Sequence, residues 1–90
     1  MPKVSFTSAL KRFYPNLETV SVEATTVADI LPELEKKYIG LSYFLVDEDG
    51  ILRQHINIFI DDRMVSDRIF LADVVSEREE ILIFQALSGG

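Results

Sequence analysis

The sequence predicts an α+β fold in which one main helix packs on a mixed sheet of four to five strands. Residues 3–7 alternate apolar and polar side chains, which is typical of a half-buried strand, and residues 80–86 contain a continuous apolar run, Ile81-Leu82-Ile83-Phe84, which is typical of a buried strand. Residues 25–40 instead carry apolar side chains at helical spacing. The order of elements is therefore two strands, a helix and then further strands. Ninety residues are enough for one domain, which we assign to residues 1–90.

The composition narrows the class of protein. Hydrophobic residues make up 48% of the chain, and the absence of cysteine excludes disulfides, zinc–thiolate sites and a cysteine nucleophile. The net charge of −6 argues against nucleic-acid binding, which needs a basic surface, and suits docking on basic enzyme surfaces. Neither a bilayer-spanning run nor a signal peptide is present. We expect a cytoplasmic protein that binds no membrane and is a monomer when alone.

The first two strands predict an antiparallel hairpin with a long loop. Residues 3–7 place Val4 and Phe6 on one face, and residues 18–23 place Val20 and Val22 inward. In the connection between them, two residues are expected to pack on the core: Leu10 and Phe13.

The helix of residues 25–40 has clear start and stop signals. Thr26 is the expected N-cap, and Asp29 lies in the first turn, where a carboxylate meets the positive end of the helix dipole. Gly40 is expected at C′, and Pro32 predicts a kink or a loosened turn. The apolar face consists of Val27, Ile30, Leu31, Leu34 and Tyr38.

Residues 41–46 are apolar, and their pattern is compatible with a strand or a helical turn. Residues 47–50 predict a turn in which Gly50 supplies a positive φ. This acidic turn lacks the twelve-residue pattern of a calcium loop, so we interpret it as a solvated turn that binds no metal.

The second half of the chain predicts further strands. Residues 54–60 form the clearest one, and Asp61-Asp62 predicts a tight hairpin into a short strand at 63–65. Residues 70–75 are compatible with a single helical turn packed on the core, and residues 76–80 with a polar turn. If the first and last strands are parallel central neighbours, the arrangement is a β-grasp roll.

Catalytic patterns are missing from the sequence. His55 is the only histidine, and no Ser–His–acid set, Gly-rich phosphate loop or paired carboxylates can be assembled by spacing. Three apolar residues fall on the strand faces opposite the isoleucines and predict an exposed partner-binding patch: Phe59, Leu82 and Phe84. The alternative is that residues 41–46 cover this face.

The last strand runs directly into a short tail, Leu87-Ser88-Gly89-Gly90. Because glycine lacks a Cβ, Gly89 and Gly90 fit a channel too narrow for other residues. Extended, the flexible tail places the Gly90 carboxylate about 15 Å from the last anchored side chain. We hypothesise that Gly90 is the working group of the protein. The alternative is an ordinary disordered chain end.

The chain resembles the MoaD/ThiS-type sulfur carriers, small ubiquitin-like β-grasp proteins. The resemblance spans nearly the whole length and rests on residues 26–31, 37–41, 52–60 and 80–90. It implies that an E1-like adenylyltransferase uses ATP to adenylate Gly90, that sulfur then displaces AMP to leave a thiocarboxylate, and that a biosynthetic enzyme accepts the sulfur. It further implies that Leu87, Ser88 and Gly89 thread the partner's active site, that Phe84 faces the partner, and that the carrier binds no cofactor itself.

Residues 52–60 look more like the longer carriers of cysteine and siderophore biosynthesis than like other members. The usual Gly-Asp before the last strand is replaced by Arg78-Glu79, and an Asn-Gly-type hairpin by Asp61-Asp62. These departures affect turns and leave the tail unchanged. Three alternatives remain: the small subunit of molybdopterin synthase, a ubiquitin-like protein modifier, and a non-covalent interaction module.

Overall fold

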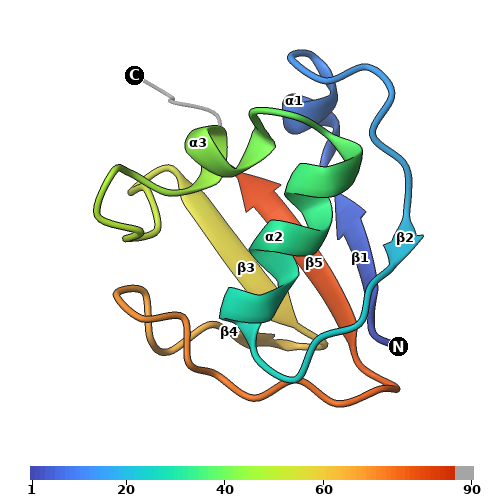
Figure 1. Cartoon of the computed structure of the whole chain (residues 1–90), viewed down its shortest axis with the longest axis vertical. Helices are drawn as coiled ribbons and strands as arrows, with labels where there is room; N and C mark the ends of the chain where they lie inside the picture. The colour runs from blue at the N-terminus through green and yellow to red at the C-terminus, as the bar shows by residue number, and fades with distance from the viewer. Residues whose placement is uncertain (87–90) are drawn as a thin grey trace.

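The computed structural model describes residues 1–86 and contains one five-stranded mixed sheet with its helices on one face (Figure 1). The strand order is β2-β1-β5-β3-β4, and β1 and β5 are parallel while the other pairs are antiparallel. The strands are β1 (Lys3–Phe6), β2 (Val20–Ser21), β3 (Ile56–Ile60), β4 (Arg63–Met64) and β5 (Glu80–Gln85). The predicted α+β fold and its parallel central pair are confirmed. The tail predictions for Leu87, Ser88, Gly89 and Gly90 lie outside the described residues.

The main helix, α2 (Val27–Lys37), begins as its sequence predicts. The Thr26 side chain accepts the Asp29 N–H, and the Asp29 carboxylate accepts the Thr26 N–H, which forms a capping box. The pKa of Asp29 is lowered, first by the Thr25 N–H and then by the Thr25 hydroxyl. The helix continues through Pro32 and ends at Lys37.

The expectation that Gly40 is the C′ residue of α2 is wrong. Tyr38 is already the C-cap, because its ring leaves the helix to pack edge-on against Phe6, with centroids 6.2 Å apart. Gly40, at φ 91°, instead begins the next helix, α3 (Leu41–Leu45). Its N–H donates to the Glu35 carboxylate at 2.7 Å, and this bond is the first cause of the lowered pKa of Glu35.

The hydrophobic core lies between the sheet and the helices. The isoleucines of β3 and β5 point into it, as the alternation predicts, and so do Val4 and Phe6 of β1. On the helical side the core is filled by Val27, Ile30 and Leu34 of α2 and by Leu41 and Leu45 of α3. Residues 41–45 are therefore helical and Val46 is extended. α3 lies beside α2 on the face opposite the outer surface of the sheet (Figure 1).

Two expectations about the loops are wrong. Residues 70–75 form no helical turn. Phe70 ends a turn, Leu71 has φ 54°, and Val74 pairs with Thr26 in an isolated bridge, because the Asp67 and Asp73 carboxylates bind the backbone N–H groups of this segment and of residues 66 and 67. Phe13, expected to pack on the core, is 59% exposed. It follows a short helix that the sequence did not indicate, α1 (Ser8–Lys11), whose Leu10 is buried as predicted.

The turns at Asp61-Asp62 and at residues 47–50 form where the sequence predicts them. Asp61, at φ 55°, closes the tight β3–β4 hairpin, and Gly50 has φ 80° in the predicted acidic turn. Val65 lies beyond β4 but is buried, and its N–H donates to Ile58 O at 2.8 Å. Within residues 1–86, the helices are all too short and too polar to cross a membrane.

Candidate functional site

The candidate site is built around β5, the central strand, which lies between β1 and β3 and leads directly toward the tail (Figure 1). Its register is set on both sides, because Ile83 lies opposite Phe6 of β1 and Ile58 of β3. A strand paired on both edges is held more rigidly than an edge strand. β5 therefore offers a firm base from which to present residues 87–90.

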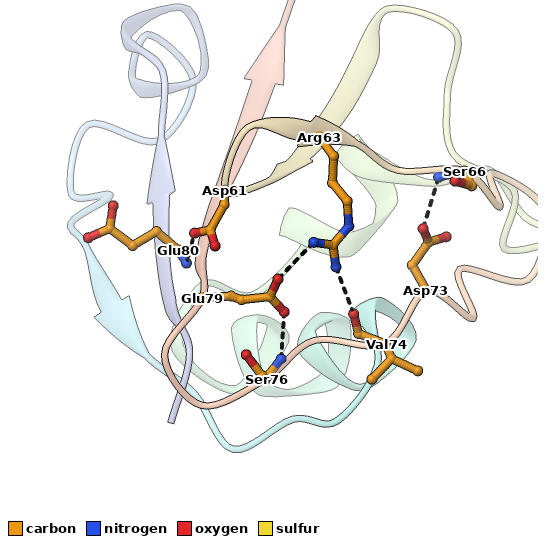
Figure 2. A network of polar contacts seen from close by, with 8 residues as sticks. All are labelled: Asp61, Arg63, Ser66, Asp73, Val74, Ser76, Glu79 and Glu80. Carbon is orange, nitrogen blue, oxygen red and sulfur yellow. Dashed lines mark hydrogen bonds and ion pairs between the residues drawn. The ribbon is translucent and has the colours of Figure 1, made fainter.

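The start of β5 is anchored by a polar network, which Figure 2 shows. Arg63 of β4 donates to the Glu79 carboxylate at 2.9 Å and to Val74 O at 3.4 Å. The Ser76 N–H donates to the Glu79 carboxylate at 2.7 Å, and this bond is the first cause of the lowered pKa of Glu79. The hydrogen bond from Arg63 lowers the same pKa further. These contacts tie the 66–79 loop to the β3–β4 hairpin at the point where β5 begins.

The end of β5 is anchored by hydrogen bonds that backbone N–H groups donate. The Gln85 N–H donates to the Thr7 hydroxyl at 3.3 Å, and the Ala86 N–H donates to His55 O at 2.8 Å. The chain is thus hydrogen-bonded on both sides up to Ala86, the last described residue. A surface pocket of about 400 Å³ opens beside this point, lined by Thr7, Ser8, Ala9, Phe84, Gln85 and Ala86.

The outer face of the sheet carries the apolar patch that the alternation predicts. Phe59 lies opposite Leu82, and its ring meets Phe84 edge-on with centroids 6.3 Å apart. Phe84 is 38% exposed, and Phe59 and Leu82 are half-buried. Met64 of β4, opposite Phe59 and exposed, extends the patch and was missed by the sequence analysis. We call Phe59, Met64, Leu82 and Phe84 the sheet-face patch.

Met64 lies on this face because it pairs with Phe59 in the β3–β4 register. Its place in the patch could not be predicted from the sequence, because a two-residue strand shows too little alternation. The predicted alternative, in which residues 41–46 cover the outer face, is wrong because α3 packs on the helical side with Leu41 and Leu45 in the core. Whether a partner binds the patch stays a prediction.

An acidic pocket adjoins the sheet-face patch. It is lined by Ser5, Asp61, Asp62, Glu80, Ile81 and Leu82. Asp61 accepts the Glu80 N–H at 2.8 Å, which holds the β3–β4 hairpin against the start of β5 (Figure 2). Three carboxylates around one pocket create a negative potential beside an apolar surface. Such a surface complements an apolar patch with basic residues at its rim.

His55 is not part of a catalytic or metal-binding cluster in the described residues. Its exposed ring meets Phe44 edge-on, with centroids 6.3 Å apart. Within residues 1–86, no three side chains of His, Cys, Asp or Glu converge as a metal site would require.

Comparison with known proteins decides the family. The chain matches the ThiS family over residues 4–90, from β1 to the last glycine. It belongs to the ThiS family. The predicted resemblance to MoaD/ThiS-type carriers is thereby confirmed, since the match covers nearly the whole chain, including the tail.

Two curated relatives are similar in sequence. The sulfur carrier protein CysO of Mycobacterium tuberculosis is 28% identical over 89 residues, which cover 97% of this chain and 96% of CysO. Small archaeal modifier protein 3 of Haloferax volcanii is 32% identical over 65 residues, covering 72% of this chain and 70% of that protein. The first likeness spans nearly the full length of both proteins.

Among solved structures, a chain of the BexX/CysO complex of Amycolatopsis orientalis superposes with a TM-score of 0.84. It is 26% identical in sequence, and the match covers 100% of both chains. The β-grasp arrangement of residues 1–86 is therefore shared with that chain.

Proposed function

We propose that this ThiS-family protein is a sulfur carrier that holds sulfur as a thiocarboxylate on Gly90. The likeness to CysO, a protein named as a sulfur carrier, over 97% of the chain supports this role most strongly. In this role the chain is a carrier and a substrate of other proteins, and it is not itself a catalyst. The polar network and the main-chain bonds around β5 support it further, because they hold the base of the tail in place.

The proposed chemistry begins with a carboxylate, which is a poor electrophile. An E1-like adenylyltransferase joins the Gly90 carboxylate oxygen to the α-phosphorus of ATP and releases pyrophosphate. Hydrosulfide then attacks the acyl carbon, AMP leaves with the bonding electron pair, and a thiocarboxylate remains. One difficult substitution is split into two easier ones. ATP is a substrate of the partner in this scheme.

Delivery of the sulfur needs a second partner. The thiocarboxylate sulfur attacks an electrophilic carbon of the acceptor, which is bound to a biosynthetic enzyme. A leaving group on that carbon departs with the electron pair of its bond, and the new carbon–sulfur bond makes a thioester. Water then cleaves the thioester, so the product keeps the sulfur and Gly90 returns to a carboxylate. The relative CysO of Amycolatopsis orientalis is found in a complex with BexX, which supports the idea that this carrier also forms complexes with partner enzymes.

The sheet-face patch and the acidic pocket are the proposed docking surface for the activating enzyme. The patch supplies apolar contact, and the pocket favours a basic rim on the partner. Both lie along β5 and the β3–β4 hairpin, so docking there aligns β5 with the partner. Leu87, Ser88 and Gly89 then thread the channel that leads to the reactive centre.

Intact mass spectrometry tests the carrier role. The full chain is incubated with the E1-like adenylyltransferase of the same organism, ATP and sulfide. We expect a mass gain equal to one sulfur in place of one oxygen, localised to Gly90 by fragmentation and absent without ATP. A chain lacking Gly90 serves as the control and stays unmodified. An unchanged mass, with an enzyme that consumes ATP on this carrier, would contradict the proposal.

A second candidate function is protein modification, which the likeness to small archaeal modifier protein 3 favours. Here a lysine amine attacks the carbonyl carbon of the same Gly90 acyl-adenylate, AMP leaves with the bonding electron pair, the amine loses a proton, and an isopeptide bond remains. The products separate the two functions, because modification yields conjugates of higher mass and the carrier yields a thiocarboxylate. If the chain lacking Gly90 keeps its full function, both covalent functions fail and a non-covalent module remains.

A further inference from the structure

The end of the molecule from which the tail leaves carries aromatic rings from three separate segments. Phe13 follows α1, Phe44 belongs to α3, and His55 precedes β3. The ring centroids of Phe13 and Phe44 are 4.9 Å apart, and those of Phe44 and His55 are 6.3 Å apart. Figure 1 shows α1 and α3 near the end of β5. We call Phe13, Phe44 and His55 the aromatic collar.

The collar adjoins the base of the tail directly, because the Ala86 N–H donates to His55 O at 2.8 Å. The Phe13 ring is 59% exposed, His55 is exposed and Phe44 is half-buried. A phenylalanine that stays mostly exposed contributes little burial to folding. Exposed rings grouped at one place are characteristic of surfaces that bind other proteins.

The length of the tail requires contact at this end. The four residues 87–90 span at most about 14 Å when fully extended. An enzyme that reacts with the Gly90 carboxylate must bring its reactive centre within that distance of Ala86. The walls of a channel around the tail then reach the surface beside Ala86, where the collar lies. This requirement is independent of any contact with the sheet-face patch.

We propose that the aromatic collar packs against an apolar rim at the mouth of the activating enzyme's channel when Gly90 is threaded. The proposal rests on the proposed function and adds a second contact surface to the sheet-face patch. The rings select an apolar or aromatic rim, because tilted and edge-on aromatic contacts gain stability when water is excluded. The sheet-face patch orients the carrier, and the collar seals the entrance around the tail.

Steady-state ATP–pyrophosphate exchange, with the full chain as the varied substrate of the E1-like adenylyltransferase, tests the collar. We expect Phe13→Ala and His55→Ala each to raise KM for the carrier about fivefold or more, the loss typical of a well-packed interface residue. The value of kcat should stay near that of the wild type, because neither residue touches the reacting atoms. Thermal unfolding of both variants checks that the fold is intact.

Val74→Ala is the matched control, because Val74 is 70% exposed and lies on the 66–79 loop, where it pairs with Thr26. Its KM should equal that of the wild type. A photo-crosslinking residue at position 13 should couple to the enzyme, and one at position 74 should not. Wild-type KM values for both collar variants, with normal exchange by the wild type, would overturn the collar and leave the carrier role standing. Absence of exchange by the wild type would overturn the adenylation on which both proposals rest.

Discussion

The two faces of strands β3 and β5 carry alternate residues of the same short segments, yet they differ in burial. On the inner face Ile58, Ile81 and Ile83 are at most 1% exposed, whereas Phe84 on the outer face is 38% exposed. Successive side chains of a strand point to opposite faces. The inner face of these strands therefore stabilises the fold, and the outer face is the one that we propose for partner binding. β5 contributes residues to both faces.

The largest expected effect comes from the inner face. Ile83→Ala removes a fully buried side chain of the core, and we expect the free energy of unfolding to fall by about 3 kcal/mol. Urea unfolding followed by circular dichroism measures this loss. Leu82→Ala, one residue away on the outer face and half-buried, should cost clearly less. Equal losses at the two positions would break the contrast between the faces.

A smaller loss is expected from the helix that covers the inner face. Thr26→Ala removes the oxygen that accepts the Asp29 N–H, and it should lower the free energy of unfolding by about 1 kcal/mol. Thr26→Ser keeps that oxygen and should restore most of the stability. Affinity for the activating enzyme should stay unchanged in both variants, since α2 lies away from the outer face. A weakened complex would show that α2 takes part in docking.

Acid should destabilise the loop that leads into β5. The Ser66 and Asp67 N–H groups lower the pKa of Asp73 from its ordinary value of 3.8. A carboxylate with a lowered folded pKa stabilises the fold above its ordinary pKa, and this stabilisation is lost as the pH falls through the folded value. Unfolding measured between pH 5 and about 2 should show this decline, and Asp73→Asn should make it shallower. An unchanged slope in the variant would contradict the role of Asp73.

The smallest effect is expected on the solvent side of α2. Lys36 forms an ion pair with Glu33 at 2.9 Å, but the Lys36 side chain is 72% exposed. Lys36→Ala should change the free energy of unfolding by less than about 0.5 kcal/mol, because exposed ion pairs are screened by water and salt. The same urea titration measures it. A loss as large as that of Thr26→Ala would mean that this surface pair is part of a wider network.

Local patterns predicted most of the fold. Alternation identified the buried and outer faces of β1, β3 and β5, and Thr26 with Asp29 identified the start of α2. These features depend on neighbours within a few residues. Residues 70–75 were misjudged because the Asp67 and Asp73 carboxylates satisfy the backbone N–H groups that a helical turn would otherwise use.

The site could be predicted only in part. Phe59, Leu82 and Phe84 follow from alternation, but their exposure depends on where α3 packs, which is a long-range property. The aromatic collar joins Phe13, Phe44 and His55 across separate elements, and no local spacing brings them together. The short helix α1 has no side-chain cap hydrogen bond and was not predicted. The position of Phe13, which follows this helix, was therefore predicted wrongly.

The most direct test of the division between the two faces is the affinity of Phe84→Asp for the E1-like adenylyltransferase, measured by isothermal titration. Phe84 is exposed on the outer face, so the variant should fold with little loss of stability while its affinity falls at least tenfold. A carboxylate at this position cannot replace the apolar contact, and its burial against an apolar partner surface costs desolvation free energy. Wild-type affinity, or severe unfolding of the variant, would contradict the assignment of this face to the partner.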